Sequence, residues 1–157
     1  MKKATLVLVV SAALVLAFVY HRRIYQDDEK RIREIISKIE KHAEAKNTDG
    51  MMEYVSDDYS DDSGLNKFYL RRMLQSRMGE LDELKVEIKD LDVFVSGEKA
   101  TVNLALTAQA TRKGKIFFPL GSEDKPEHPK ITFRKTGTGD WEIIEIDNVD
   151  TGPKLGI

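Results

Sequence analysis

Residues 84–111 read LKVEIKDLDVFVSGEKATVNLALTAQAT, and their alternation sets the class of the fold. On both sides of Gly97, apolar and polar side chains alternate with a period of two, which is the pattern of half-buried strands. Ser96-Gly97-Glu98-Lys99 is a turn, so the stretch predicts an antiparallel hairpin. The alternation slips by one residue at Lys89-Asp90, and this slip predicts a β-bulge that bends the first strand.

One face of this hairpin is expected to face the core, and none of its side chains is ionisable. These side chains are Val86, Ile88, Leu91, Val93, Val95, Val102, Leu104, Leu106, Ala108 and Ala110. The opposite row on the second strand is also uncharged, and consists of Thr101, Asn103, Ala105, Thr107, Gln109 and Thr111. Such a row fits a protein contact through Asn103, Thr107 and Gln109, or a plain solvated face, because threonine favours strands by itself. Phe118, in an apolar run that opens the next loop, is a further contact candidate.

Shorter strands are expected after the hairpin, at residues 116–118, 131–133 and 141–146, with glycine-rich or proline-rich turns between them. Before the hairpin, apolar side chains spaced by three or four predict a helix that begins at Asp27-Asp28, where acids favour a helix N-terminus. A short helix over residues 51–55, an acidic loop over 56–64 and a third helix over 65–78 follow. The order predicts an α+β domain at residues 24–148, with about three helices on a curved antiparallel sheet, and a flexible tail at 149–157.

The composition excludes several classes of site. With 157 residues and 41% hydrophobic side chains, the chain suffices for one folded domain. The absence of cysteine excludes disulfides, thiolate metal sites and a cysteine nucleophile. Beyond residue 23 the net charge is about −6, which gives no basic footprint for nucleic acid.

The N-terminal segment carries the pattern of a membrane signal. No charged side chain occurs between Ala4 and Tyr20, and cations stand on both sides of this run. We expect residues 1–23 to be an uncleaved anchor with residues 4–20 in the bilayer; a cleaved signal peptide ending at Val15-Leu16-Ala17 is the alternative. The short basic N-terminus favours an inside orientation, with the domain outside the cytoplasm on a single-pass protein of the cytoplasmic membrane, periplasmic in a Gram-negative cell.

Three stretches carry a resemblance to a known family: residues 59–67 (YSDDSGLNK), 97–102 (GEKATV) and 139–143 (GDWEI). Over about residues 27–148 the chain resembles the nuclear-transport-factor-2-like, or SnoaL-like, superfamily in a membrane-anchored variant. The resemblance implies a cone-shaped, cystatin-like fold. It implies no single activity, because the superfamily includes isomerases, dehydratases, ligand carriers, dimerising adaptors and membrane-tethered subunits of secretion machines.

Enzymes of this superfamily place an Asp or His inside the cone, and the inward row described above has none. The remaining catalytic candidates are His42, Tyr54 and Asp61, and a solvated helix histidine is the favoured interpretation of His42. Tyr54, Tyr59, Asp62 and Tyr69 are candidates for the mouth of the cone or for a ligand contact.

Four carboxylates lie in the acidic loop, at Asp57, Asp58, Asp61 and Asp62. Carboxylates attract calcium, but the spacing does not match an EF-type loop, so helix capping is favoured and no metal is expected. No cofactor is expected either.

The sequence therefore predicts a membrane-tethered, non-catalytic binding or assembly module of the cell envelope, acting as a homodimer or with an envelope protein. The alternative is a small isomerase or lyase of the SnoaL or ketosteroid-isomerase type, or a carrier, that acts on a hydrophobic ligand in the cone.

Overall fold

The computed structural model describes the backbone of residues 2–149 and the side chains of residues 11–20 and 22–149. Three helices precede the strands. In chain order the elements are α1 (Lys2–Glu44), α2 (Thr48–Met52), α3 (Lys67–Gly79), β1 (Glu83–Ser96), β2 (Lys99–Arg112), β3 (Lys115–Leu120), β4 (Lys130–Lys135) and β5 (Trp141–Asp147). The predicted α+β order and the predicted strands are confirmed, with boundaries that differ by a few residues.

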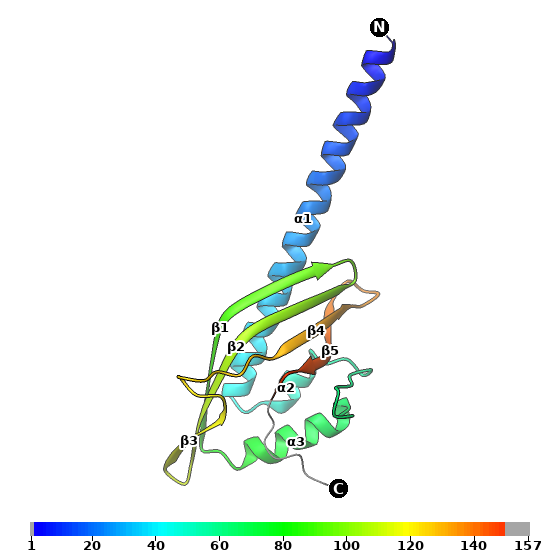
Figure 1. The fold of residues 1–157 in the computed structure, drawn as a ribbon. Coiled ribbons are helices and arrows are strands. Elements are labelled where there is room, and N and C mark those ends of the chain that lie inside the picture. The colour runs from blue at the N-terminus through cyan, green and yellow to red at the C-terminus, as the bar shows by residue number, and fades with distance from the viewer. Residues whose placement is uncertain (1, 150–157) are drawn as a thin grey trace.

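The sheet is antiparallel in the order β1-β2-β4-β5, and β3 pairs with the far part of β2. The register of β1 against β2 shifts between Lys89 and Asp92, where Asp90 has a φ of 51°. The predicted β-bulge is therefore present. The long β1–β2 hairpin bends along its length, and the sheet curves around the helices (Figure 1).

The core lies between the inner face of the sheet and the three helices. Val102 on β2 and Phe133 on β4 are fully buried there, and Ile32 of α1 is buried against them in the same cluster. Ile88, Leu91, Val93 and Val95 of β1 are partly buried and pack on this cluster. The apolar face predicted from the alternation is thus the core face.

Helix α1 differs from the expectation of two separate segments. It is one continuous helix of 43 residues, and its N-terminal part projects beyond the domain (Figure 1). The prediction that a helix begins at Asp27-Asp28 is wrong, because no glycine or proline interrupts residues 2–44 and the helix simply continues. Asp28 instead lies in the middle of the helix, and its side chain is buried against the domain, with 4% of the residue exposed.

Among the residues whose side chains are described, no helix has a stretch long and apolar enough to cross a membrane. Part of the predicted anchor, at residues 1–10 and 21, lies outside those side chains. Residues 150–157 of the predicted tail lie outside the described residues as well.

The acidic loop between α2 and α3 docks on the free edge of β5. The Ile143 N–H donates to the Tyr54 carbonyl at 2.8 Å, and the Ser56 N–H donates to the Ile143 carbonyl at 2.8 Å. Further along, the Ser60 N–H donates to the Ile144 carbonyl at 3.1 Å. The loop therefore occupies the place of a further strand and brings its acidic side chains to β5.

Candidate functional site

The three catalytic candidates do not form a common site. His42 lies at the corner between α1 and α2, where its Nδ1 is 3.2 Å from Asn47 Nδ2 and its ring is 6.3 Å from the Tyr54 ring. Asp61 Oδ1 accepts hydrogen bonds from the N–H groups of Ser63 and Leu65, at 2.9 Å each. These contacts shape the helical corner and the acidic loop. No hydrogen bond within residues 11–20 and 22–149 joins His42, Tyr54 and Asp61 to one another.

The mouth candidates also separate. Tyr59 is a core residue with 3% exposure, whereas Tyr69 is 57% exposed on the outside of α3 beside Phe68. Tyr54 is half-buried and Asp62 is exposed. These side chains therefore do not line one opening.

Two hollows adjoin the helices, and neither is lined by the mouth candidates. One, of about 200 Å³, lies between α1 and the bulge of β1 and is lined by Arg33, Ile36, Ser37, Glu40, Ile88, Lys89, Asp90 and Leu91. Burial and the nearby charge of Glu44 raise the pKa of the Glu40 carboxyl. The other, of about 330 Å³, lies between the start of α2 and the end of α3. Both open to the surface, whereas the interior behind the sheet is occupied by the apolar core.

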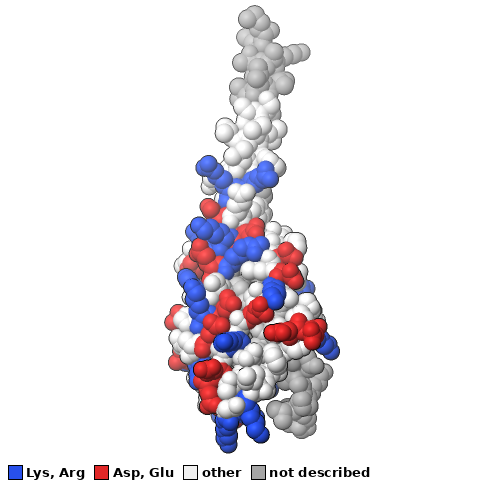
Figure 2. Space-filling view, turned by 90° about the vertical axis from the view of Figure 1, so that its left-hand side faces the viewer, with Lys and Arg blue, Asp and Glu red and all other residues white. Residues whose placement is uncertain are grey.

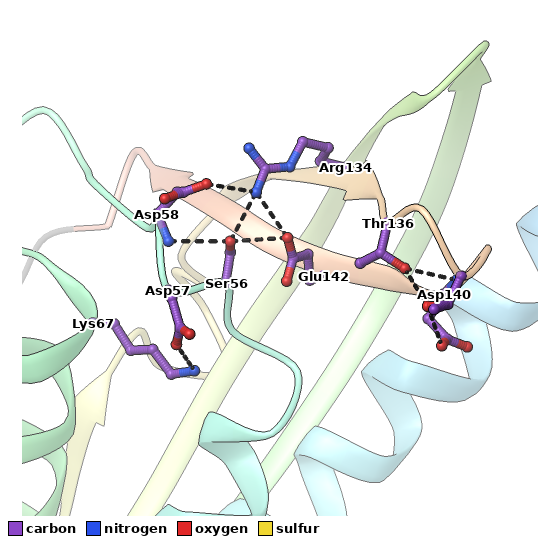
Figure 3. A network of polar contacts seen from close by, with 9 residues as sticks. Ser56, Asp57, Asp58, Lys67, Arg134, Thr136, Asp140 and Glu142 are labelled. Carbon is purple, nitrogen blue, oxygen red and sulfur yellow. Dashed lines mark hydrogen bonds and ion pairs between the residues drawn. The ribbon is translucent and has the colours of Figure 1, made fainter.

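A polar network centred on Ser56 ties the acidic loop to β4 and β5 (Figure 3). The Ser56 hydroxyl donates to Glu142 Oε1 at 2.9 Å and accepts from the Asp58 N–H at 3.2 Å and from Arg134 Nη2 at 3.1 Å. Arg134 Nη2 also donates to Glu142 Oε1 at 2.8 Å and to Asp58 Oδ2 at 2.9 Å. Because these bonds use the donor and both acceptor positions of the buried hydroxyl, Ser56 holds the loop and is not arranged as a nucleophile.

A second acid cluster was not predicted. Carboxylate oxygens of Asp62 from the loop and of Glu145 and Asp147 from β5 all lie within 4.8 Å of one another. Burial and the charges of Asp61, Asp147 and Glu145 raise the pKa of the nearby Tyr59 phenol. From the sequence, only the alternation of Glu145 and Asp147 on one strand could be predicted. Asp62 joins them because the acidic loop docks on β5.

The predicted interface row follows β2 on the outer face of the sheet. Asn103 is exposed, Thr107 and Gln109 are half-buried, and Phe118 on β3 is 44% exposed. Ala105, expected in the same exposed row, is buried. Within the loop over residues 121–129, Glu127 pairs antiparallel with Leu106 of this strand: the Leu106 N–H donates to the Glu127 carbonyl and the Glu127 N–H donates back. The accessible part of the row is therefore shorter than the sequence predicted.

The projecting part of α1 is apolar and exposed. Leu14, Leu16 and Phe18 are 66%, 69% and 66% exposed. Figure 2 shows this uncharged stretch of the helix above basic side chains at the top of the domain. These side chains need a partner outside the domain to be removed from water.

Solved structures with similar folds were found by comparison of the whole chain. An NTF2-like protein with a cystatin-like fold from Novosphingobium aromaticivorans has a TM-score of 0.64 at 17% identity, covering 82% of this chain and 84% of its own. The fold is NTF2-like. An NTF2-like superfamily protein from Salmonella enterica has a TM-score of 0.66 at 14% identity, covering 85% and 96%.

A proposed scytalone dehydratase from N. aromaticivorans has a TM-score of 0.64 at 12% identity, covering 78% of this chain and 83% of that one. No family model and no curated protein matches the sequence. At these identities the likeness extends to the NTF2-like fold, and the structural neighbours confirm that part of the resemblance seen in the sequence.

Proposed function

We propose that the chain is a membrane-tethered, non-catalytic binding or assembly module of the cell envelope, with its NTF2-like domain outside the cytoplasm. The observation that carries this proposal is the free apolar part of α1, which continues without a break into a domain whose interior is occupied by apolar side chains. When the apolar part of such a helix inserts into a partner, the helix holds the domain at a fixed position next to that partner.

The bilayer is the partner that fits the apolar part of α1. From Ala4 to Tyr20 the sequence has no charge, and a helix of that length covers about 25 Å, slightly less than a typical hydrocarbon core. Tyr20, Arg22 and Arg23 can extend to the polar interface and make up the difference.

Hydrogen bonds join the strands of the domain to this helix. The Gly97 N–H in the β1–β2 turn donates to the Tyr25 hydroxyl at 3.4 Å, and Arg31 Nη1 donates to the Gly139 carbonyl at 3.3 Å. Asp28, between these positions on α1, binds Lys135 and Trp141. In this proposal the end of the domain that carries these two turns faces the membrane. The outer face of the sheet then points sideways. A second copy or an envelope protein can contact its side chains there, namely Asn103, Thr107, Gln109 and Phe118.

An enzymatic role is the second candidate, and the fold shared with a proposed scytalone dehydratase favours it. It requires a polar group inside the cone. Within the described part of the chain, the inward row of β1 and β2 is apolar, and the buried Asp28 carboxylate is held by Lys135 and Trp141. This arrangement favours the binding module.

Membrane attachment is tested with the full-length chain carrying a C-terminal tag. We expect the protein to stay in the membrane pellet after alkaline extraction, and the double variant L14D/L16D to be released. The matched control is Phe68→Asp, which changes an exposed apolar residue on α3 and should leave attachment intact. Release of the unchanged protein would contradict the anchor. An alkaline phosphatase fusion after Ile157 should be active, and an inactive fusion would contradict the orientation.

The binding role is tested by crosslinking in cells, followed by solubilisation and mass spectrometry. We expect a stoichiometric envelope partner or a self-crosslink that the double variant N103R/Q109R abolishes. Gln75→Arg on the exposed side of α3 is the control and should retain it. A crosslink that persists in N103R/Q109R would exclude the outer face. Turnover of a small hydrophobic compound by the protein, without any partner, would favour the enzymatic candidate.

A further inference from the structure

The tip of the β1–β2 hairpin lies beside α1, close to the end of its apolar part. The Gly97 N–H in the tip donates to the Tyr25 hydroxyl at 3.4 Å, and the uncharged run of α1 ends at Tyr20. Side chains of a helix point back toward its N-terminus, so the Tyr25 hydroxyl and Gly97 lie level with the turn before Tyr25. At about 1.5 Å per residue, the tip is therefore within about 7.5 Å of the end of the run, measured along the helix.

For a membrane-spanning α1, this level is the polar layer of the bilayer. The headgroup region takes up about 5–7 Å on each side of a hydrocarbon core of about 30 Å. The uncharged run covers only about 25 Å, so the residues just beyond Tyr20 are drawn toward the core. No glycine or proline separates Tyr20 from Tyr25, and α1 is helical throughout this part. The helix therefore places the hairpin tip at the depth of the headgroups.

A large apolar side chain is exposed next to this tip. Phe94 is 60% exposed on the outer side of β1, whereas Val93 and Val95 on either side of it pack on the core. Its neighbours on the outer face are polar, with Thr101 opposite it on β2 and Asp92 on the same strand. Figure 1 shows that this end of the hairpin crosses α1 and that β1 is the strand nearest the projecting part of the helix. Phe94 is thus a single apolar side chain on the end of the domain that faces the apolar helix.

Basic side chains accompany Phe94 at this end of the domain. Arg22, Arg23 and Lys99 are exposed and form no ion pair within the side chains that the structure describes. Figure 2 shows basic side chains directly beneath the uncharged stretch of the helix. Lipid phosphates are the anions present at this depth. Because the acids Asp27 and Glu98 are exposed nearby, the apolar contact carries the proposal and the net charge does not.

We propose that the tip of the β1–β2 hairpin is a second membrane contact, in which Phe94 enters the headgroup layer and Lys99 binds a lipid phosphate. This inference rests on the proposed membrane anchor. It adds that the domain lies against the bilayer in one orientation, because contacts from both α1 and the hairpin restrict rotation about the helix. One apolar side chain among polar neighbours suits the mixed headgroup layer better than the apolar centre of a protein interface.

The chain has no cysteine, so a single introduced cysteine carries a fluorescent dye at one known position. The full-length variants Phe94→Cys and Phe68→Cys are labelled and reconstituted into vesicles of phosphatidylcholine and phosphatidylglycerol that contain spin-labelled lipids. Phe68 is the matched control, because it is equally exposed, at 60%, and lies on α3 at the far end of the domain (Figure 1). We expect a spin label on the lipid headgroup to quench the dye at position 94 at least about threefold more strongly than the dye at position 68.

A third labelled variant separates this inference from the anchor on which it rests. A dye on Leu16→Cys should be quenched by lipids that carry the spin label within their acyl chains. If the dye at position 16 is not quenched, the anchor and this inference both fail. If the dye at position 16 is quenched but the dye at position 94 behaves like the one at position 68, the anchor stands and this inference fails.

The role of the aromatic side chain itself is measured with a dye on Glu98→Cys in the turn. Phe94→Asp should reduce the headgroup quenching of this dye at least about twofold, Phe94→Leu should retain it, and Phe68→Asp should leave it unchanged. Equal quenching in Phe94→Asp and Phe94→Leu would contradict a contact through Phe94. A dye at position 94 that is shielded in detergent as protein concentration rises, and is not quenched by lipid, would assign Phe94 to a protein interface and overturn the proposal.

Discussion

The Nζ atom of Lys135 lies 2.9 and 2.8 Å from the two carboxylate oxygens of Asp28, joining the middle of α1 to the end of β4. Trp141 Nε1 donates to the same carboxylate at 3.1 Å, and Lys135 lies over the Trp141 ring at 5.5 Å from its centroid. Asp28 is thus a buried charge with specific partners, and it fixes the angle at which α1 leaves the domain.

Removing Lys135 should therefore destabilise the protein strongly. In Lys135→Met the Asp28 carboxylate stays buried with only Trp141 as a donor, and we expect a loss of about 3 kcal/mol in the free energy of unfolding. Asp28→Asn should cost less, about 2 kcal/mol, because the partly exposed Lys135 can turn to water. Urea unfolding measures both. The exposed pair Arg112–Glu80 provides the control, since Arg112→Met should cost less than about 1 kcal/mol; equal effects would show that the burial of Asp28 has no energetic consequence.

Ser56→Ala should loosen the acidic loop. Ser56 is 2% exposed, and removal of its hydroxyl leaves the Asp58 N–H and one Arg134 N–H without that acceptor, so we expect a loss of about 1–2 kcal/mol. Amide hydrogen exchange should increase over residues 56–60 and leave the β1–β2 hairpin unchanged. Ser76→Ala on the exposed side of α3 is the control and should be neutral or slightly stabilising, because alanine favours helices. If Ser56→Ala behaves like Ser76→Ala, the network does not hold the loop.

Gly50→Ala tests the close packing at the corner between α1 and α2. A Cβ atom at Gly50 would lie 2.5 Å from His42 Nδ1 and 2.7 Å from Asn47 Nδ2, so both side chains must move. We expect a loss of about 1–3 kcal/mol, as for other overpacked sites, and a smaller loss when His42→Ala is already present, because the contact with Asn47 then remains alone. Thermal unfolding of the single and double variants measures the coupling. Gly79→Ala, where a Cβ meets nothing within 4 Å, should be neutral or stabilising; a loss as large as that of Gly50→Ala would contradict the packing argument.

Two side chains of α1 bind backbone groups of β1 that face away from β2. Glu44 Oε1 accepts from the Val86 N–H at 3.1 Å, and Arg33 Nη1 donates to the Leu91 carbonyl at 2.8 Å. Unpaired strand edges promote association between chains, and charged side chains on them oppose it. The double variant R33A/E44A should therefore aggregate faster than the unchanged protein in light scattering at matched concentration. The control Lys38→Ala, on the exposed side of α1, should aggregate no faster than the unchanged protein. Equal aggregation rates of R33A/E44A and Lys38→Ala would show that the strand edge is protected by other means.

The strands could be predicted because their signals are local. The period of two, the glycine turn and the one-residue slip at Lys89-Asp90 each involve neighbours in the chain, and the structure has the hairpin and the bulge at those positions. The boundary at Asp27-Asp28 was predicted wrongly for a related reason. Acids at a helix start and acids inside a helix look alike until the packing is known.

The chemistry of the acids and of His42 could not be assigned from the chain alone. His42 was considered as a base, and its contacts with Asn47 and the close approach of Gly50 place it in the corner of two helices. Asp62 belonged to a run of four similar aspartates, and only the docking of the loop on β5 singled it out.

The sequence by itself determined the α+β class, the curved hairpin, the apolar lining of the sheet and the uncharged segment at the N-terminus, because periodicity and turn residues act over a few positions. Only the tertiary structure decided which polar and charged groups meet: Asp28 with Lys135, Ser56 with Arg134 and Glu142, and Asp62 with Asp147. These pairs are separated by tens of residues. A solvated charge and a paired one have the same letter in the sequence, and the difference arises when α1 and the acidic loop pack against the sheet and exclude water.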